Sequence, residues 1–101
     1  MVSVELQKSW RVSEALLTRA RRTLPVPPPA RKNEFDQCIR EFEDFLSHNE
    51  FGLALDALEA AGYLVAASGG FWRDLERVAE NMGLGARALQ FREKFAEAQK
   101  R

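Results

Sequence analysis

The apolar residues of this 101-residue chain recur at helical spacing, and this periodicity limits the possible folds more than any other feature. Between residues 33 and 47 the apolar side chains follow one another at steps of three, one, three, three and one: Phe35, Cys38, Ile39, Phe42, Phe45 and Leu46. Residues 3–23, 49–66, 70–82 and 85–98 also show helical patterns, whereas no useful length of chain alternates as a half-buried strand would. The sequence therefore predicts an all-α protein: a single compact domain of four to five helices, arranged as antiparallel hairpins or a bundle.

Capping and breaking residues predict where these helices begin and end. Candidate N-caps precede four of them: Ser3, Asn33, Asn49 and Ser68. Gly83 stands where a left-handed C-cap belongs. The proline-rich residues 24–30 should form an extended linker, because proline lacks an N–H and disfavours helix in the residue before it. Gly62 indicates either a kink or an early end of the third helix, which is apolar on most sides and should lie centrally.

The net charge is zero, but the charges are unevenly distributed along the chain. Residues 1–32 carry +5, residues 33–62 carry −7 and residues 63–101 carry +2. On the first helix, the side opposite the apolar face carries Lys8, Arg11, Arg19 and Arg22. We expect this basic helix to pack near the acidic second helix and to be partly compensated by it. Basic residues along one helix are a weak indication of nucleic-acid binding when the chain as a whole has no net positive charge. No direct nucleic-acid binding is therefore predicted.

No set of residues with catalytic or metal-binding chemistry stands out in the sequence. The only histidine, His48, lies ten residues after the only cysteine, Cys38, which falls within an apolar stripe and should be a buried core thiol. The charged pairs on the second helix are explained by i,i+4 contacts on a solvated face. We therefore expect no enzyme activity, no cofactor and no metal.

The sequence also shows no feature of a membrane or secreted protein. The longest stretch without charge, residues 60–72, is too short for a spanning helix, and early charges interrupt any signal peptide. A lone cysteine agrees with a cytoplasmic location.

The acidic middle of the chain is the feature that favours a binding function. Its carboxylates flank the apolar stripes of two predicted helices: Glu34, Glu41, Glu43, Glu50, Asp56 and Glu59. Acidic side chains on rigid helices would suit a basic cleft, such as that of a nuclease, because complementary charge speeds encounter and selects the partner.

Two motifs in this region resemble a known family. Residues 42–62 read FEDFLSHNEFGLALDALEAAG, and residues 71–84 read FWRDLERVAENMGL. They are similar to the MafI-type small helical immunity proteins of bacterial contact-dependent toxin systems. That family shows a His-x-Glu-x-Gly-(Leu/Ile)-Ala-Leu-(Glu/Asp) run, here residues 48–56, and a later Met-Gly-Leu, here residues 82–84. The likeness covers about residues 38–85; Leu58-Glu59 replaces the Cys-Asp pair that the family often has.

This resemblance implies that the protein neutralises a toxin domain, often a nuclease, by binding it and blocking its active site. Under that reading the contact residues would be Glu50 and Asp56 first, then Glu41, Asp44 and Glu59. The motif residues with a mainly architectural role would be His48, Asn49, Gly52 and Gly83.

The alternative is a small helical scaffold with hairpins like those of tetratricopeptide repeats. No 34-residue period appears in the sequence, which weighs against a true repeat array. The oligomeric state stays open, since Trp10, Tyr63 and Trp72 could belong to a core or to a dimer patch.

Overall fold

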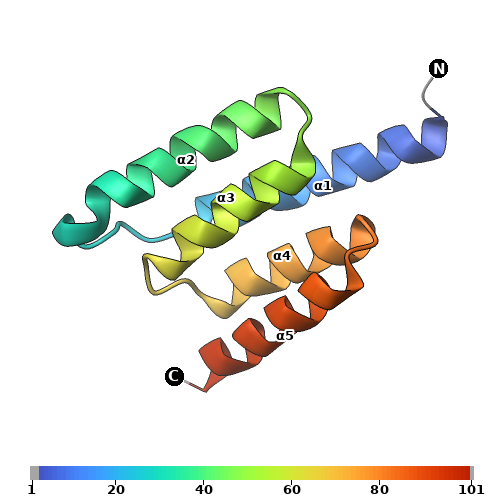
Figure 1. The fold of residues 1–101 in the computed structure, drawn as a ribbon. Coiled ribbons are helices and arrows are strands. Elements are labelled where there is room, and N and C mark those ends of the chain that lie inside the picture. Colours follow the sequence, from blue (N-terminus) through green and yellow to red (C-terminus); the bar gives the residue numbers. More distant parts are fainter. Residues whose placement is uncertain (1–2, 101) are drawn as a thin grey trace.

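The computed structural model describes residues 3–100, which form five α-helices and one short 3₁₀ turn (Figure 1). In chain order these are α1 (Val4–Arg22), η1 (Pro29–Arg31), α2 (Lys32–Ser47), α3 (Phe51–Tyr63), α4 (Gly69–Asn81) and α5 (Gly85–Gln99). No strand occurs within this described part of the chain. The predicted all-α single domain is confirmed.

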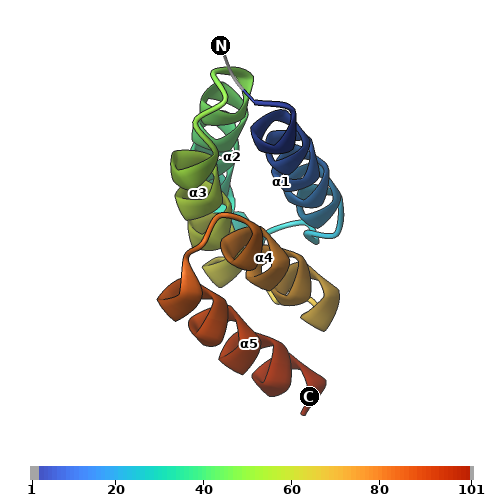
Figure 2. The ribbon, with the colours of Figure 1, turned by 90° about the vertical axis from the view of Figure 1, so that its right-hand side faces the viewer.

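Two helical hairpins and one long helix make up the domain. α2 pairs with α3, and α4 pairs with α5. α1 packs mainly against α4 and also against α3, and so joins the two hairpins, which touch each other directly through a small α3–α4 contact (Figures 1 and 2). Among the α-helices, α2 packs mainly against α3, so it lies at the outside of the molecule.

The core lies where α3, α4 and α1 meet. α3 buries seven of its thirteen residues, in agreement with the central position predicted for it. Phe71 of α4 is fully buried, and its ring meets Trp72 edge-on at a centroid distance of 4.9 Å. A Cβ on Gly62 would lie 2.5 Å from the Phe71 ring, so this glycine permits the close approach of α3 and α4. α3 ends one residue later, at Tyr63, rather than continuing to residue 66.

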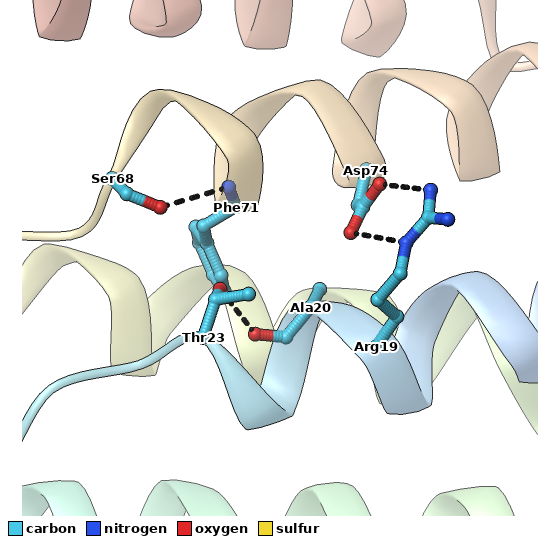
Figure 3. A network of polar contacts seen from close by, with 6 residues as sticks. All are labelled: Arg19, Ala20, Thr23, Ser68, Phe71 and Asp74. Atoms are coloured by element: carbon cyan, nitrogen blue, oxygen red, sulfur yellow. Dashed lines mark hydrogen bonds and ion pairs between the residues drawn. The ribbon is translucent and has the colours of Figure 1, made fainter.

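Two of the predicted N-caps are confirmed. The Ser3 hydroxyl accepts a hydrogen bond from the Leu6 N–H at 3.1 Å, and the Ser68 hydroxyl accepts one from the Phe71 N–H at 3.3 Å (Figure 3). The prediction for Asn33 is wrong, because α2 already begins at Lys32. The cause lies in the linker: Pro28 is extended as predicted, but Pro29 opens a 3₁₀ turn that leads the chain directly into α2.

Asn49 does not cap α3 but ends α2. It has φ +57°, and its N–H bonds to the Leu46 carbonyl while the next N–H, of Glu50, bonds to the Phe45 carbonyl. These two bonds define a Schellman motif with Asn49 in the left-handed position. Gly83 (φ +74°) forms the same pair of bonds at the end of α4, which confirms it as a C-cap.

The two hairpin turns lie 34 positions apart in the sequence and share one backbone conformation. The C-caps His48 and Met82 have φ/ψ of −100°/12° and −92°/1°, and the next N-caps, Glu50 and Leu84, have −90°/72° and −96°/69°. The hairpins therefore repeat in geometry although the sequences show no repeat. They do not stack directly as consecutive repeats, because α1 bridges them.

Candidate partner-binding surface

The outward face of α2 carries an exposed row of carboxylates. The helix buries Phe35, Ile39 and Phe42 against its neighbours, and their spacing turns the intervening residues to the outside. The exposed acidic residues of this helix are Glu34, Glu41, Glu43 and Asp44. Between residues 32 and 63 the chain has two basic and eight acidic residues, a net charge of −6 that belongs to the α2–α3 hairpin.

Two of the predicted contact residues, Glu41 and Asp44, lie on this face. Glu41 accepts a hydrogen bond from the Gln37 side chain at 3.1 Å. Asp44 lies 3.7 Å from the ring of His48, whose Nδ1 is 2.8 Å from the Asp44 carbonyl oxygen. This backbone hydrogen bond, followed by the Asp44 carboxylate, raises the pKa of His48 above its ordinary value. Both carboxylates stay exposed to solvent.

Asp56 and Glu59 are placed differently from the other predicted contact residues. Both form ion pairs with Arg87 of α5, with oxygen–nitrogen distances of 2.6 and 2.7 Å. Their charge is therefore partly compensated within the molecule. They connect α3 to α5, so the five residues predicted from sequence do not form one uncompensated patch.

Glu50 occupies the turn between α2 and α3. It is the N-cap residue of α3, its side chain makes no capping hydrogen bond, and it is exposed. Within residues 3–100 no ion pair involves it. A free carboxylate at a helix N-terminus is favourably placed with respect to the helix dipole. Of the five predicted residues, Glu50 has the carboxylate most available to a partner.

The glycines of the motif have separate structural settings. Gly52 lies in the first turn of α3, where a Cβ would make ordinary contact with Met82 at 3.8 Å. Gly83 would meet nothing within 4 Å, and its left-handed φ accounts for its presence. Asn49 supplies the equivalent left-handed residue of the α2–α3 turn, and it is this turn that holds Glu50.

The basic side chains of α1 form no ion pair with α2 among residues 3–100, contrary to the expectation. Arg21 does lie over a side chain of α2, 6.0 Å from the centre of the Phe35 ring, but this residue is apolar. α1 packs against α4 and α3, and its one described ion pair joins Arg19 to Asp74 of α4. The guanidinium donates from both Nε and a terminal nitrogen, at 3.1 and 2.6 Å (Figure 3). Asp74 is buried, and this contact raises the pKa of Arg19. The acidic surface of α2 is therefore not neutralised by α1.

A buried carboxylate, Glu76, was missed by the sequence analysis. Its side chain is 2% exposed and accepts from Arg92 at 3.1 Å and from Arg73 at 3.4 Å. Its position in the sequence indicates burial, because residue 76 stands four positions after Trp72 and next to Leu75, within the apolar stripe of α4. A charged residue at such a position is expected to be paired, as it is here.

The described residues contain no cluster of metal-ligating side chains. No group of three His, Cys, Asp or Glu residues able to hold a metal ion occurs within residues 3–100. Cys38 is partly buried rather than fully buried as predicted, and burial, followed by the charges of Glu41 and Glu34, raises the pKa of its thiol. A raised thiol pKa reduces the thiolate that a nucleophile requires. In the same range, no helix has the length and apolar content needed to cross a bilayer.

The fold and the surface define an all-α domain of two hairpins bridged by a long helix, with an acidic hairpin on the outside. Comparison with models of protein families, with curated proteins and with solved structures finds no match in any of the three. The resemblance to MafI-type immunity proteins therefore stays a prediction from the motif residues.

Proposed function

We propose that this protein is an immunity protein that binds a cognate bacterial toxin domain, such as a nuclease, and occludes its active site. The observation that carries the proposal is the acidic α2–α3 hairpin, with a net charge of −6. Its outer helix contacts its own hairpin partner, and its exposed carboxylates are not neutralised by the basic helix α1. A surface of this kind complements the positive cleft of an enzyme that acts on nucleic acid.

The rigid presentation of these carboxylates supports the same proposal. The residues that belong to the family-like run, 48–56, build the Schellman turn and the first turns of α3. They hold Glu50 at the outside of the molecule, next to the row on α2 that includes Glu41 and Asp44. Preorganised charges cost little ordering entropy when a partner binds.

The test is rescue of growth by co-expression with the C-terminal domain of a toxin encoded directly upstream of this gene. The wild-type protein should restore growth and should bind the purified domain at a ratio of one to one. Glu50→Lys, alone and combined with Glu41→Lys, should slow association several-fold at low salt, and the effect should shrink as salt screens the charges. A wild-type protein that neither binds the domain nor rescues growth contradicts the proposal.

The control variant must change the same charge elsewhere. Glu93→Lys on α5 alters the net charge by the same amount as Glu50→Lys, and Glu93 is exposed with no ion pair among residues 3–100. It should leave association unchanged. Asp56→Lys is a poor choice, because it would also break the ion pair with Arg87 and change the α3–α5 contact.

A helical scaffold without a toxin partner is the second candidate. The observation in its favour is the repeated hairpin geometry, with equivalent turns at Asn49 and Gly83. This reading expects specific binding to another protein of the cell whether or not a toxin is present, and no growth rescue.

A further inference from the structure

The first two turns of α1 extend beyond the rest of the domain. α1 has 19 residues, whereas α3 and α4 have 13 each, so α1 is about 28 Å long and its neighbours about 20 Å, at 1.5 Å per residue. The end of α4 is fixed against α1 by Asn81, whose amide donates to the Ser9 carbonyl and to the Ser13 hydroxyl, both at 2.8 Å. α1 therefore continues past this contact toward its N-terminus (Figure 1).

This overhang leaves two large apolar residues of the core-facing stripe uncovered. Leu6 and Trp10 continue the row that is buried further along at Ser13, Leu17 and Ala20, yet they are 44% and 36% exposed. Trp10 is held from one side by Phe51 of α3, with ring centroids 6.5 Å apart.

A hollow of about 240 Å³ opens beside these residues, where α1 meets the start of α3 and the end of α4. Its lining is Leu6, Ser9, Trp10, Ser13, Phe51, Asn81 and Met82. Four of the seven lining residues are apolar, and the Asn81 amide joins the other two polar ones through its hydrogen bonds to Ser9 and Ser13. A volume of this size can accept one bulky apolar side chain, and a partly exposed Trp in such a setting is typical of an interface anchor.

The charges next to the hollow indicate which surface would carry that side chain. Glu50 directly precedes the lining residue Phe51, and Glu14 lies one helical turn beyond Trp10. Both are exposed and neither forms an ion pair within residues 3–100. The nearest cations in sequence are Arg11, next to Trp10, and Lys8, two residues from both Leu6 and Trp10. Neither lines the hollow: Lys8 falls on the opposite side of α1, and Arg11 borders a separate hollow together with Glu14. The side of the rim formed by the α2–α3 turn is therefore acidic, through Glu50.

We propose that this hollow is the anchor pocket for the toxin domain, and that it receives a Leu-, Met- or Phe-sized side chain presented on a basic surface. The inference rests on the proposed immunity function and adds to it the site of apolar contact. It places the centre of the interface at the overhang of α1 and the turn at Glu50. The carboxylates of α2 then form the charged periphery that guides encounter, while the hollow supplies the desolvated contact that holds the complex together.

The test compares Leu6→Asp with Val12→Asp. These residues lie on the same helix with nearly equal exposure, 44% and 47%, but Val12 does not line the hollow. Leu6→Asp should weaken binding of the upstream-encoded toxin domain by at least about tenfold, mainly through faster dissociation, while Val12→Asp should change it by less than about twofold. Ser9→Phe, which fills the hollow, should also weaken binding. Circular dichroism should show unchanged helix content in all three.

Fluorescence provides a second readout of the same pocket. Trp72 is 3% exposed and Trp10 is 36% exposed, so Trp72→Phe leaves Trp10 as the reporter. Its emission should move to shorter wavelength when the toxin domain binds. If the wild-type protein rescues growth but Leu6→Asp and Val12→Asp bind equally, or the Trp10 emission stays constant on binding, the anchor pocket is refuted and the immunity function stands. If the wild-type protein neither rescues nor binds, both proposals fail together.

Discussion

Two glycines of the same helix should respond in opposite directions to replacement by alanine. A Cβ at Gly62 would lie 2.5 and 2.8 Å from two atoms of the Phe71 ring and 3.1 Å from Trp72. Both aromatic side chains are buried and packed on one another, so neither ring can move away freely. At Gly52 a Cβ would meet only the flexible end of Met82, at 3.8 Å.

The expected magnitudes follow from these distances. Overpacking a core costs about 1–3 kcal/mol, and the gain in helix propensity from glycine to alanine is at most about 1 kcal/mol. It is smaller for Gly62, which is the last residue but one of α3. Gly62→Ala should therefore lower the free energy of unfolding by about 1–2 kcal/mol, and Gly52→Ala should raise it by about 0.5 kcal/mol.

Urea denaturation followed by circular dichroism measures both changes. For a domain of this size, 1 kcal/mol corresponds to a shift in Tm of about 4–8 °C. Equal m-values would show that the two variants unfold to the same extent as the wild type. A Gly62→Ala protein as stable as the wild type would refute the close approach of α3 and α4 at this position.

Three further substitutions test the turns and the buried charge. Asn49→Gly should stabilise the protein by about 0.5–1 kcal/mol in thermal unfolding, because glycine adopts the left-handed backbone without strain; a loss of stability would contradict the Schellman turn. The folded-state pKa of His48 is raised by its contacts with Asp44, so its contribution to stability is present below the unfolded value near 6.5 and is lost as the pH rises through the folded value. The Tm difference between wild type and His48→Gln should accordingly shrink between pH 5.5 and 8.5, and a constant difference would exclude this linkage. Arg92→Ala should cost about 1.5 kcal/mol in urea, since buried Glu76 loses the closer of its two charged donors while Arg92 itself is largely exposed.

The sequence predicted helix type and most helix positions because periodicity and capping are local properties. Ser3, Ser68 and Gly83 act where their local chemistry places them. The prediction of an N-cap at Asn33 is wrong because Pro29 starts a 3₁₀ turn that leads into α2 before residue 33. Asn49 suits an N-cap and a left-handed C-cap equally well, and the choice depends on where α2 ends.

The arrangement of the helices required tertiary information that one sequence does not contain. Complementary charge suggested that α1 lies on α2, but packing of the apolar row at Leu17 and Ala20 against α4 and α3 determines its position. Burial of such side chains outweighs surface charge contacts, which contribute about 1 kcal/mol or less each. The one ion pair that α1 forms within residues 3–100, Arg19–Asp74, follows from this packing.

The carboxylates of the acidic surface differ in how far their charge is compensated within the molecule. Counting charges along the chain treats Asp56 and Glu50 alike, but Arg87 holds Asp56 at 2.6 Å, whereas Glu50 has no partner among the described residues. A charge already paired within the free protein gains less from a second partner, since part of its field is compensated before binding. The carboxylates without an ion pair among the described residues are therefore Glu41 and Glu43 on α2 and Glu50 at the turn, and the turn borders the apolar hollow at Trp10. Charge and apolar contact converge at this one end of the molecule because α1 is longer than the helices it packs against.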